Sequence, residues 1–100
     1  MPFGTAGPLL DEAKDIFKTL LRFDTSNPPG MEKECADWCI QQLRDAGVDD
    51  IKIFDADTDE CAPGSLRRSF VARLPGTLPE SEDLMLSAHL DVVPAERESW

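Results

Sequence analysis

The chain has 100 residues, 41% of them apolar, with twenty acidic and ten basic side chains and a net charge of −10. This length corresponds to one small domain with a modest core. The acidic balance argues against nucleic acid, whose recognition needs a basic stripe, and against an anionic membrane surface. No run of residues approaches the roughly 18 apolar residues of a membrane span.

Cysteine usage and the first residues indicate a reduced, cytoplasmic protein. The three cysteines, Cys35, Cys39 and Cys61, are odd in number and too sparse for a disulfide scaffold. Residues 1–10 contain neither a basic region nor the apolar run of about seven residues that a signal peptide needs. We therefore expect a cytoplasmic location.

Two amphipathic helices are predicted in the first half of the chain. Residues 1–8 are expected to form a short flexible lead. In residues 9–21 the apolar positions recur at spacings of three and four, which defines one helix face. A loop rich in proline and glycine, residues 23–30, precedes a second helix over residues 32–46, which Gly47 ends.

Three strands follow, because the hydrophobic period changes after the second helix. Residues 51–54 and 69–74 are short and partly alternating. Residues 84–89 are a continuous apolar run, typical of a central strand buried on both faces. The predicted fold class is α/β, with helices packed on a mixed, mostly parallel sheet. Few residues remain to flank the last strand, so we expect an incomplete domain.

His89, the only histidine, stands where the last apolar run gives way to a loop, and Asp91 follows two residues later. Ends of buried strands are where α/β proteins place ligands. A metal-bound imidazole donates its second N–H to an acceptor, and a carboxylate there fixes the tautomer. From the spacing alone, two interpretations stay open: a metal ligand with its partner, or a structural histidine beside an aspartate that braces the turn before Pro94.

Three blocks of the sequence resemble one enzyme family. Residues 84–94 (LMLSAHLDVVP), followed by Trp100, are similar to the first metal-binding motif of the acetylornithine deacetylase and succinyl-diaminopimelate desuccinylase family, which includes aminoacylase and the glutamate carboxypeptidases. Residues 20–30 (LLRFDTSNPPG) resemble the segment after the first helix of those enzymes, and residues 70–76 (FVARLPG) resemble their second strand. The blocks occur in the family's order and span nearly all of the chain.

The resemblance implies that residues 9–100 are the amino-terminal part of a catalytic domain with a zinc-exopeptidase-like fold. It places His89 as a metal ligand to one zinc of a two-metal centre, in which cobalt can substitute, and Asp91 as the catalytic aspartate that hydrogen-bonds and tunes that histidine. The implied reaction is hydrolysis of the amide bond of a small N-acyl amino acid or a short peptide.

The rest of that family's site has no matching position in this chain. The bridging aspartate, the glutamate base, a neighbouring acidic ligand and a distal histidine come later, as does a dimerisation domain that implies a homodimer for the full-length protein. We therefore expect these 100 residues to be inactive by themselves, and the substrate stays open among deacetylase, desuccinylase, dipeptidase and carboxypeptidase activities.

Other candidate sites have simpler interpretations. Cys35 and Cys39 are spaced as two thiolate ligands on a helix could be, but they fall on its apolar stripe, which favours core packing. Cys61 lies in an acidic loop that disfavours a thiolate. Residues 55–59 (DADTD) resemble the start of a calcium loop, which fails because Glu60 and Leu66 replace the required glycine and glutamate.

Thr25, Ser26 and Asn27 either border a substrate cleft or form a turn. Two alternatives to the enzyme also stay open: a non-catalytic α/β binding or interaction module, in which His89 and Asp91 are structural, and a truncated gene product. The coding sequence downstream of Trp100 would discriminate, since later Asp, Glu and His ligands favour the enzyme.

Overall fold

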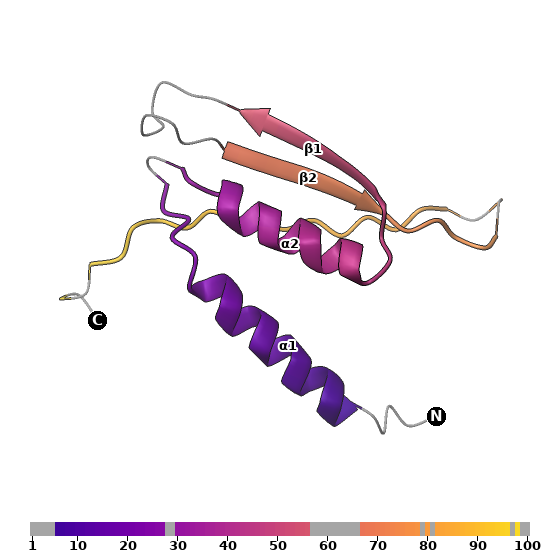
Figure 1. Cartoon of the computed structure of the whole chain (residues 1–100), viewed down its shortest axis with the longest axis horizontal. Coiled ribbons are helices and arrows are strands. Elements are labelled where there is room, and N and C mark those ends of the chain that lie inside the picture. Colours follow the sequence, from indigo (N-terminus) through magenta and orange to yellow (C-terminus); the bar gives the residue numbers. More distant parts are fainter. Residues whose placement is uncertain are drawn as a thin grey trace.

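The computed structural model describes residues 6–27, 30–56, 67–78, 80, 82–96 and 98. Its elements in chain order are α1 (Ala6–Leu21), α2 (Lys33–Asp45), β1 (Asp50–Ala56) and β2 (Arg67–Arg73) (Figure 1). The chain is therefore a mixed α and β structure, as the sequence predicts. No described helix has the length and apolar character needed to cross a membrane.

The sheet formed by β1 and β2 is antiparallel, with Ile53 opposite Phe70 and Asp55 opposite Arg68. These strands are consecutive and separated by residues 57–66 only, whereas a parallel pair needs a crossover connection of about a dozen residues or more, usually a helix. Among the described residues this pair is the whole sheet.

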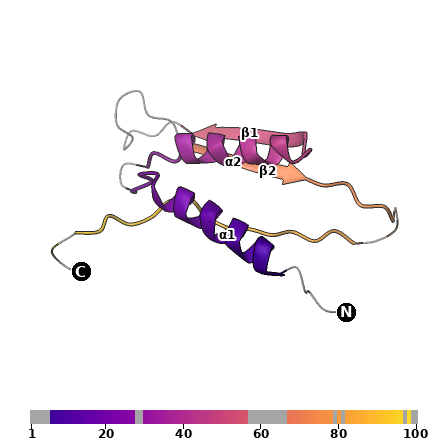
Figure 2. The ribbon, with the colours of Figure 1, turned by 60° about the horizontal axis from the view of Figure 1, so that its bottom comes forward.

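Helix α1 begins at Ala6, three residues before the predicted start. Pro8 lies in its first turn, where a missing N–H costs no hydrogen bond, so the helix can include it. Its apolar face stays open, with Leu9, Phe17 and Leu21 more than half exposed. Figure 2 shows α2 lying over the sheet while α1 lies apart from it.

Helix α2 supplies most of the small core. Cys35, Ala36 and Ile40 are buried on one face of the helix, and Val48 is buried just after it. Gly47 adopts φ +93°, a conformation that glycine takes without steric cost, and Val48 N–H donates to the carbonyl of Leu43. The predicted end of this helix is thereby confirmed.

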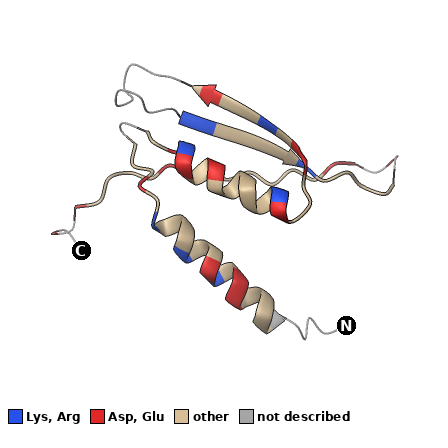
Figure 3. Cartoon of the chain, in the orientation of Figure 1, with Lys and Arg blue, Asp and Glu red and all other residues tan. Residues whose placement is uncertain are grey.

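An arginine at the start of β2 joins the sheet to α2. The Arg68 guanidinium donates to Asp55 on β1 over 2.6 Å and to Asp37 on α2 over 2.7 Å. Figure 3 shows this basic start of β2 near acidic residues of both elements. The hydrogen bond from Arg68 holds the pKa of Asp55 below its ordinary value, which stabilises the charged pair.

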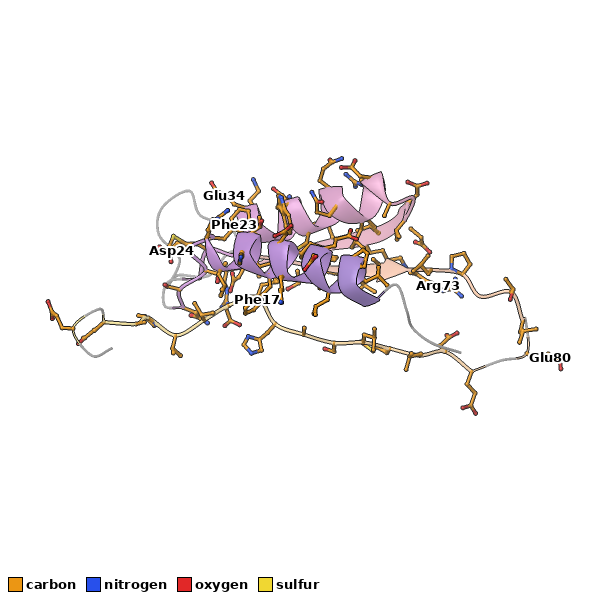
Figure 4. All side chains as sticks on the ribbon, turned by 90° about the horizontal axis from the view of Figure 1, so that it is seen from below. Phe17, Phe23, Asp24, Glu34, Arg73 and Glu80 are labelled. Carbon is orange, nitrogen blue, oxygen red and sulfur yellow. The ribbon has the colours of Figure 1, made fainter. Side chains whose placement is uncertain are left out.

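An aromatic pair holds the loop after α1 against α2. The ring centroids of Phe23 and Trp38 lie 6.1 Å apart, with the planes tilted by 49°. This distance and tilt lie within the favourable range for aromatic contacts. Figure 4 shows Phe23 beside Asp24 at this junction, where the chain leaves α1 and approaches the candidate site.

The predicted third strand is wrong for the described structure. Residues 84–89 run in an extended path without a ladder partner, and Leu84, Met85 and Leu86 are each at least 80% exposed. An apolar run of strand length forms a strand only when a neighbouring chain accepts its backbone hydrogen bonds. Among the residues described, the chain after this segment pairs only at Val92, through an isolated parallel bridge to Ser26.

Candidate functional site

The candidate site lies where the extended segment meets the loop that follows α1. Val92 N–H donates to the Thr25 carbonyl over 3.0 Å, and Asn27 N–H donates to the Val92 carbonyl over 2.8 Å. Thr25 is 4% exposed, so the loop side of this bridge is part of the folded interior. The bridge therefore fixes the backbone next to Asp91.

The imidazole of His89 is held by the residue that the sequence pairs with it. Its Nδ1 atom lies 2.9 Å from the carbonyl oxygen of Asp91 and 3.0 Å from Oδ1 of the same residue. A carbonyl and a carboxylate are both acceptors, so Nδ1 carries the proton and donates to both. The lone pair of the neutral ring is then on Nε2, and the side chain is 83% exposed, which leaves Nε2 accessible.

The carboxylate of Asp91 has partners on both oxygens. Oδ1 accepts from His89, and Oδ2 accepts from the side-chain amide of Asn27 over 3.0 Å and lies 3.6 Å from Nη2 of Arg67. The hydrogen bond from Asn27 is the largest influence that lowers the pKa of Asp91, and the neighbouring His89 and Arg67 act in the same direction. Asp91 is therefore an ionised acceptor at neutral pH.

A shallow depression of about 400 Å³ opens beside this pair, lined by Asn27, His89, Asp91, Val92 and Val93. Residues 25–27 were expected either to border a substrate cleft or to form a turn. The cleft interpretation gains support, because Asn27 lines this depression. Its wall is one amide, one imidazole, one carboxylate and two apolar side chains. Such a surface can present a single neutral nitrogen ligand next to a negative charge.

Two contributing residues carry no local signal in the sequence. Glu32 and Arg67 are 35 positions apart. Each is a charged residue next to a predicted loop, and no sequence pattern links the two. In the structure the Arg67 guanidinium binds Glu32 and also approaches Asp91. The packing of β2 against α2, which places the start of the strand near the start of the helix, brings them together.

Comparisons with known proteins leave the family open. No protein-family model matches the chain. Searches among curated proteins and among solved structures also give no match. The sequence blocks quoted above therefore carry the family resemblance by themselves.

The donor set fits one metal ligand and not a complete zinc centre. Structural and catalytic zinc sites use three or four protein ligands. Within the described part of the chain, no three His, Cys, Asp or Glu side chains are grouped so that they could hold an ion. His89 offers Nε2, while both oxygens of Asp91 are already engaged by Asn27 and His89.

The cysteines of α2 lie where core packing predicts them. Cys35 is 2% exposed and Cys39 is half-buried. Burial raises the pKa of the Cys35 thiol to about 11 and raises that of Cys39 as well, so both are neutral thiols at physiological pH. Cys61, residues 57–60, Leu66, Trp100 and residues 1–5 of the expected lead lie outside the described residues.

Proposed function

We propose that the chain is the amino-terminal part of a metal-dependent hydrolase that cleaves the amide bond of N-acyl amino acids or short peptides. One observation carries the proposal: Asp91 fixes the proton of His89 on Nδ1, which leaves the lone pair on Nε2 of an exposed ring that lines the depression. The arrangement is the outer support that metal-binding histidines use.

The residues of this chain have separable tasks in the proposed enzyme. His89 binds one ion through Nε2. Asp91 orients the ring and raises the basicity of that nitrogen. Asn27 holds Asp91 and lines the cleft beside it. Zinc, or cobalt in its place, would supply Lewis-acid polarisation of the scissile carbonyl.

The finer features of the proposal follow from the resemblance. The exposed apolar run of residues 84–86 is where further strands of a mostly parallel, zinc-exopeptidase-like sheet would pair, and the parallel bridge between Ser26 and Val92 has the matching direction. The remaining ligands and the general base come from residues outside this chain. We further propose a cytoplasmic enzyme and a homodimer for the full-length protein.

A cobalt titration tests the metal ligand directly, because His89 is the only histidine and its ring signals are unambiguous. We expect paramagnetic broadening of the His89 ring at weak affinity, and no such effect at this segment in His89→Gln. Broadening confined to acidic loops, with the imidazole unaffected, would contradict the proposal. Tight stoichiometric zinc binding by these 100 residues would contradict the single-ligand assignment.

An activity test complements the titration. The 100-residue chain should not hydrolyse N-acetyl amino acids, while a natural gene product that contains this sequence and the later ligands should do so with zinc. His89→Gln in that longer product should abolish turnover. Retention of full activity by that variant would remove the hydrolase assignment.

One observation favours a second candidate, a binding module that acts through contact. Leu84, Met85 and Leu86 form an exposed apolar run on an extended backbone, which could add a strand to a partner's sheet. In that case His89→Gln leaves partner binding intact, whereas Met85→Glu removes it. The cobalt titration separates the two candidates, since a contact module predicts no metal effect at His89.

A further inference from the structure

We infer that Arg67 and Glu32 are a positioning pair that orients Asp91 and, through it, selects the tautomer of His89; this inference rests on the proposed function only in treating His89 as the metal ligand. The pair comes from two distant parts of the chain. Glu32 precedes α2, and Arg67 begins β2. Neither residue touches the depression.

Glu32 is the buried member of the pair. It is 5% exposed, and an isolated buried carboxylate is strongly unfavourable. The Nε atom of Arg67 donates to both carboxylate oxygens of Glu32, over 3.2 and 3.1 Å, and Nη2 donates to Oε1. A planar guanidinium bound through two nitrogens is fixed in orientation as well as position.

The fixed guanidinium also reaches the candidate site. Nη2 of Arg67, the same nitrogen that binds Glu32, lies 3.6 Å from Oδ2 of Asp91. That distance gives charge attraction between partly exposed groups without a full hydrogen bond. Since Oδ2 also accepts from Asn27, the carboxylate is held on one side and presents Oδ1 to His89 on the other.

Gly30 leaves the space that the guanidinium occupies. A Cβ atom at this position would lie 2.6 Å from Nε and 2.8 Å from Cδ of Arg67, and the residue has φ +85°. The loop before α2 therefore packs its backbone directly on the arginine. The loop, β2 and the extended segment meet at one side chain, which is how a rigid part of the fold can support an exposed histidine.

The tautomer of the single histidine gives a test that does not depend on metal. Long-range proton–nitrogen correlation spectra of the ¹⁵N-labelled chain, recorded where the ring is neutral, distinguish protonated Nδ1 from protonated Nε2. The unaltered chain should show mainly the Nδ1–H form. Glu32→Gln/Arg67→Met, which leaves no buried charge unpaired, should shift the population toward the Nε2–H form that a free imidazole favours in water.

The chain provides matched comparisons. Arg68→Met removes the neighbouring arginine of β2, whose bonds go to Asp37 and Asp55, and should leave the tautomer unchanged. Asp91→Ala sets the size of the full effect. Arg67→Lys keeps the positive charge but lacks the planar guanidinium. It should therefore show an Nδ1–H population between those of the unaltered chain and the double variant.

A folded double variant with an unchanged tautomer would overturn the inference. So would a tautomer shift of equal size in Arg68→Met. If the double variant does not fold, the unaltered chain still decides: the Nε–H of Arg67 should exchange with water more slowly than that of Arg22, and equal rates would refute the pair. If the tautomer shifts in the double variant but His89 of the unaltered chain binds no cobalt, the positioning pair is supported and the proposed function is refuted.

Discussion

Both acceptors of the His89 Nδ1 proton belong to one residue, Asp91, whose carbonyl and carboxylate oxygens lie 2.9 and 3.0 Å away. The two-residue spacing makes this double contact possible, because the imidazole folds back over the backbone of its own segment. The ring is therefore oriented although it is exposed. An oriented ring in an exposed position is what the proposed metal ligand requires.

Asp91→Asn should weaken cobalt binding at His89 by roughly tenfold or more, the usual cost of losing a support to a metal-binding histidine. The neutral amide can no longer raise the basicity of the imidazole, and its NH₂ group can face Nδ1. The measurement is the cobalt titration of the His89 ring signals. Asp83→Asn, an exposed acid of the same extended segment, is the control for general loss of negative charge and should change the affinity little.

Local sequence signals predicted the two helices and the positions of β1 and β2 well, but not the antiparallel pairing of these strands, since a mostly parallel sheet was expected. The second helix was expected over residues 32–46 and spans Lys33–Asp45, because its apolar stripe and its terminal Gly47 act within a few residues of each other. The first helix begins three residues earlier than expected, at Ala6, because Pro8 fits the first turn of a helix as readily as a flexible segment before it. The contact between His89 and Asp91 is also local, which is why two positions suffice to suggest it.

Long-range features were not predictable in the same way. The apolar run of residues 84–89 indicates side chains that favour burial. It does not indicate whether a partner strand is present to bury them, and in the structure Leu84, Met85 and Leu86 are exposed. The bond between Arg67 and Glu32 depends on how β2 folds back on α2, and no periodicity encodes it. Both cases show that burial and pairing across the chain need information beyond residue type.

Acid should destabilise the fold because, among the described residues, three aspartates have a lowered pKa in it. Asp91, Asp55 and Asp24 all have a pKa below the ordinary value of 3.8, owing first to hydrogen bonds from Asn27, Arg68 and Ser26 respectively. Below that ordinary value the unfolded chain binds more protons than the folded one. The stabilisation is therefore present above about pH 5 and is lost as the pH falls through the lower folded values.

Urea unfolding at a series of pH values measures this loss. Asp55→Asn should flatten the pH dependence below about pH 4, since it removes one of the three shifted groups. Asp11→Asn, on α1 and outside these bonds, should leave the slope as it is. A slope that Asp55→Asn does not change would show that the bond to Arg68 contributes nothing to folding.

The thiol of Cys35 should resist alkylation in the folded chain. With a pKa of about 11 against an ordinary 9.0, its thiolate fraction at neutral pH is roughly a hundredfold lower, and burial slows access further. Iodoacetamide labelling followed by mass spectrometry of the peptide from α2 gives the rate. Urea should restore ordinary reactivity. Fast labelling under native conditions would contradict the placement of Cys35 in the core.

Gly30→Ala and Gly47→Ala form a matched pair of substitutions that isolates the contact with Arg67. Both glycines have positive φ, +85° and +93°, so alanine at either position costs about 1–2 kcal/mol of backbone strain. A methyl at Gly47 meets nothing within 4 Å, whereas one at Gly30 would overlap the guanidinium. Gly30→Ala should therefore lower the free energy of unfolding by more than Gly47→Ala does, as measured in urea.

The same pair should also differ at the histidine. Displacing Arg67 loosens Asp91, so Gly30→Ala should raise the Nε2–H population of His89 while Gly47→Ala leaves it unchanged. The second substitution lies at the far end of α2, which makes it a control for strain without displacement. Equal losses of stability in the two variants, with the tautomer unchanged in both, would mean that the loop before α2 does not pack on the arginine. The inference that Glu32 and Arg67 orient Asp91, and through it His89, would then be refuted.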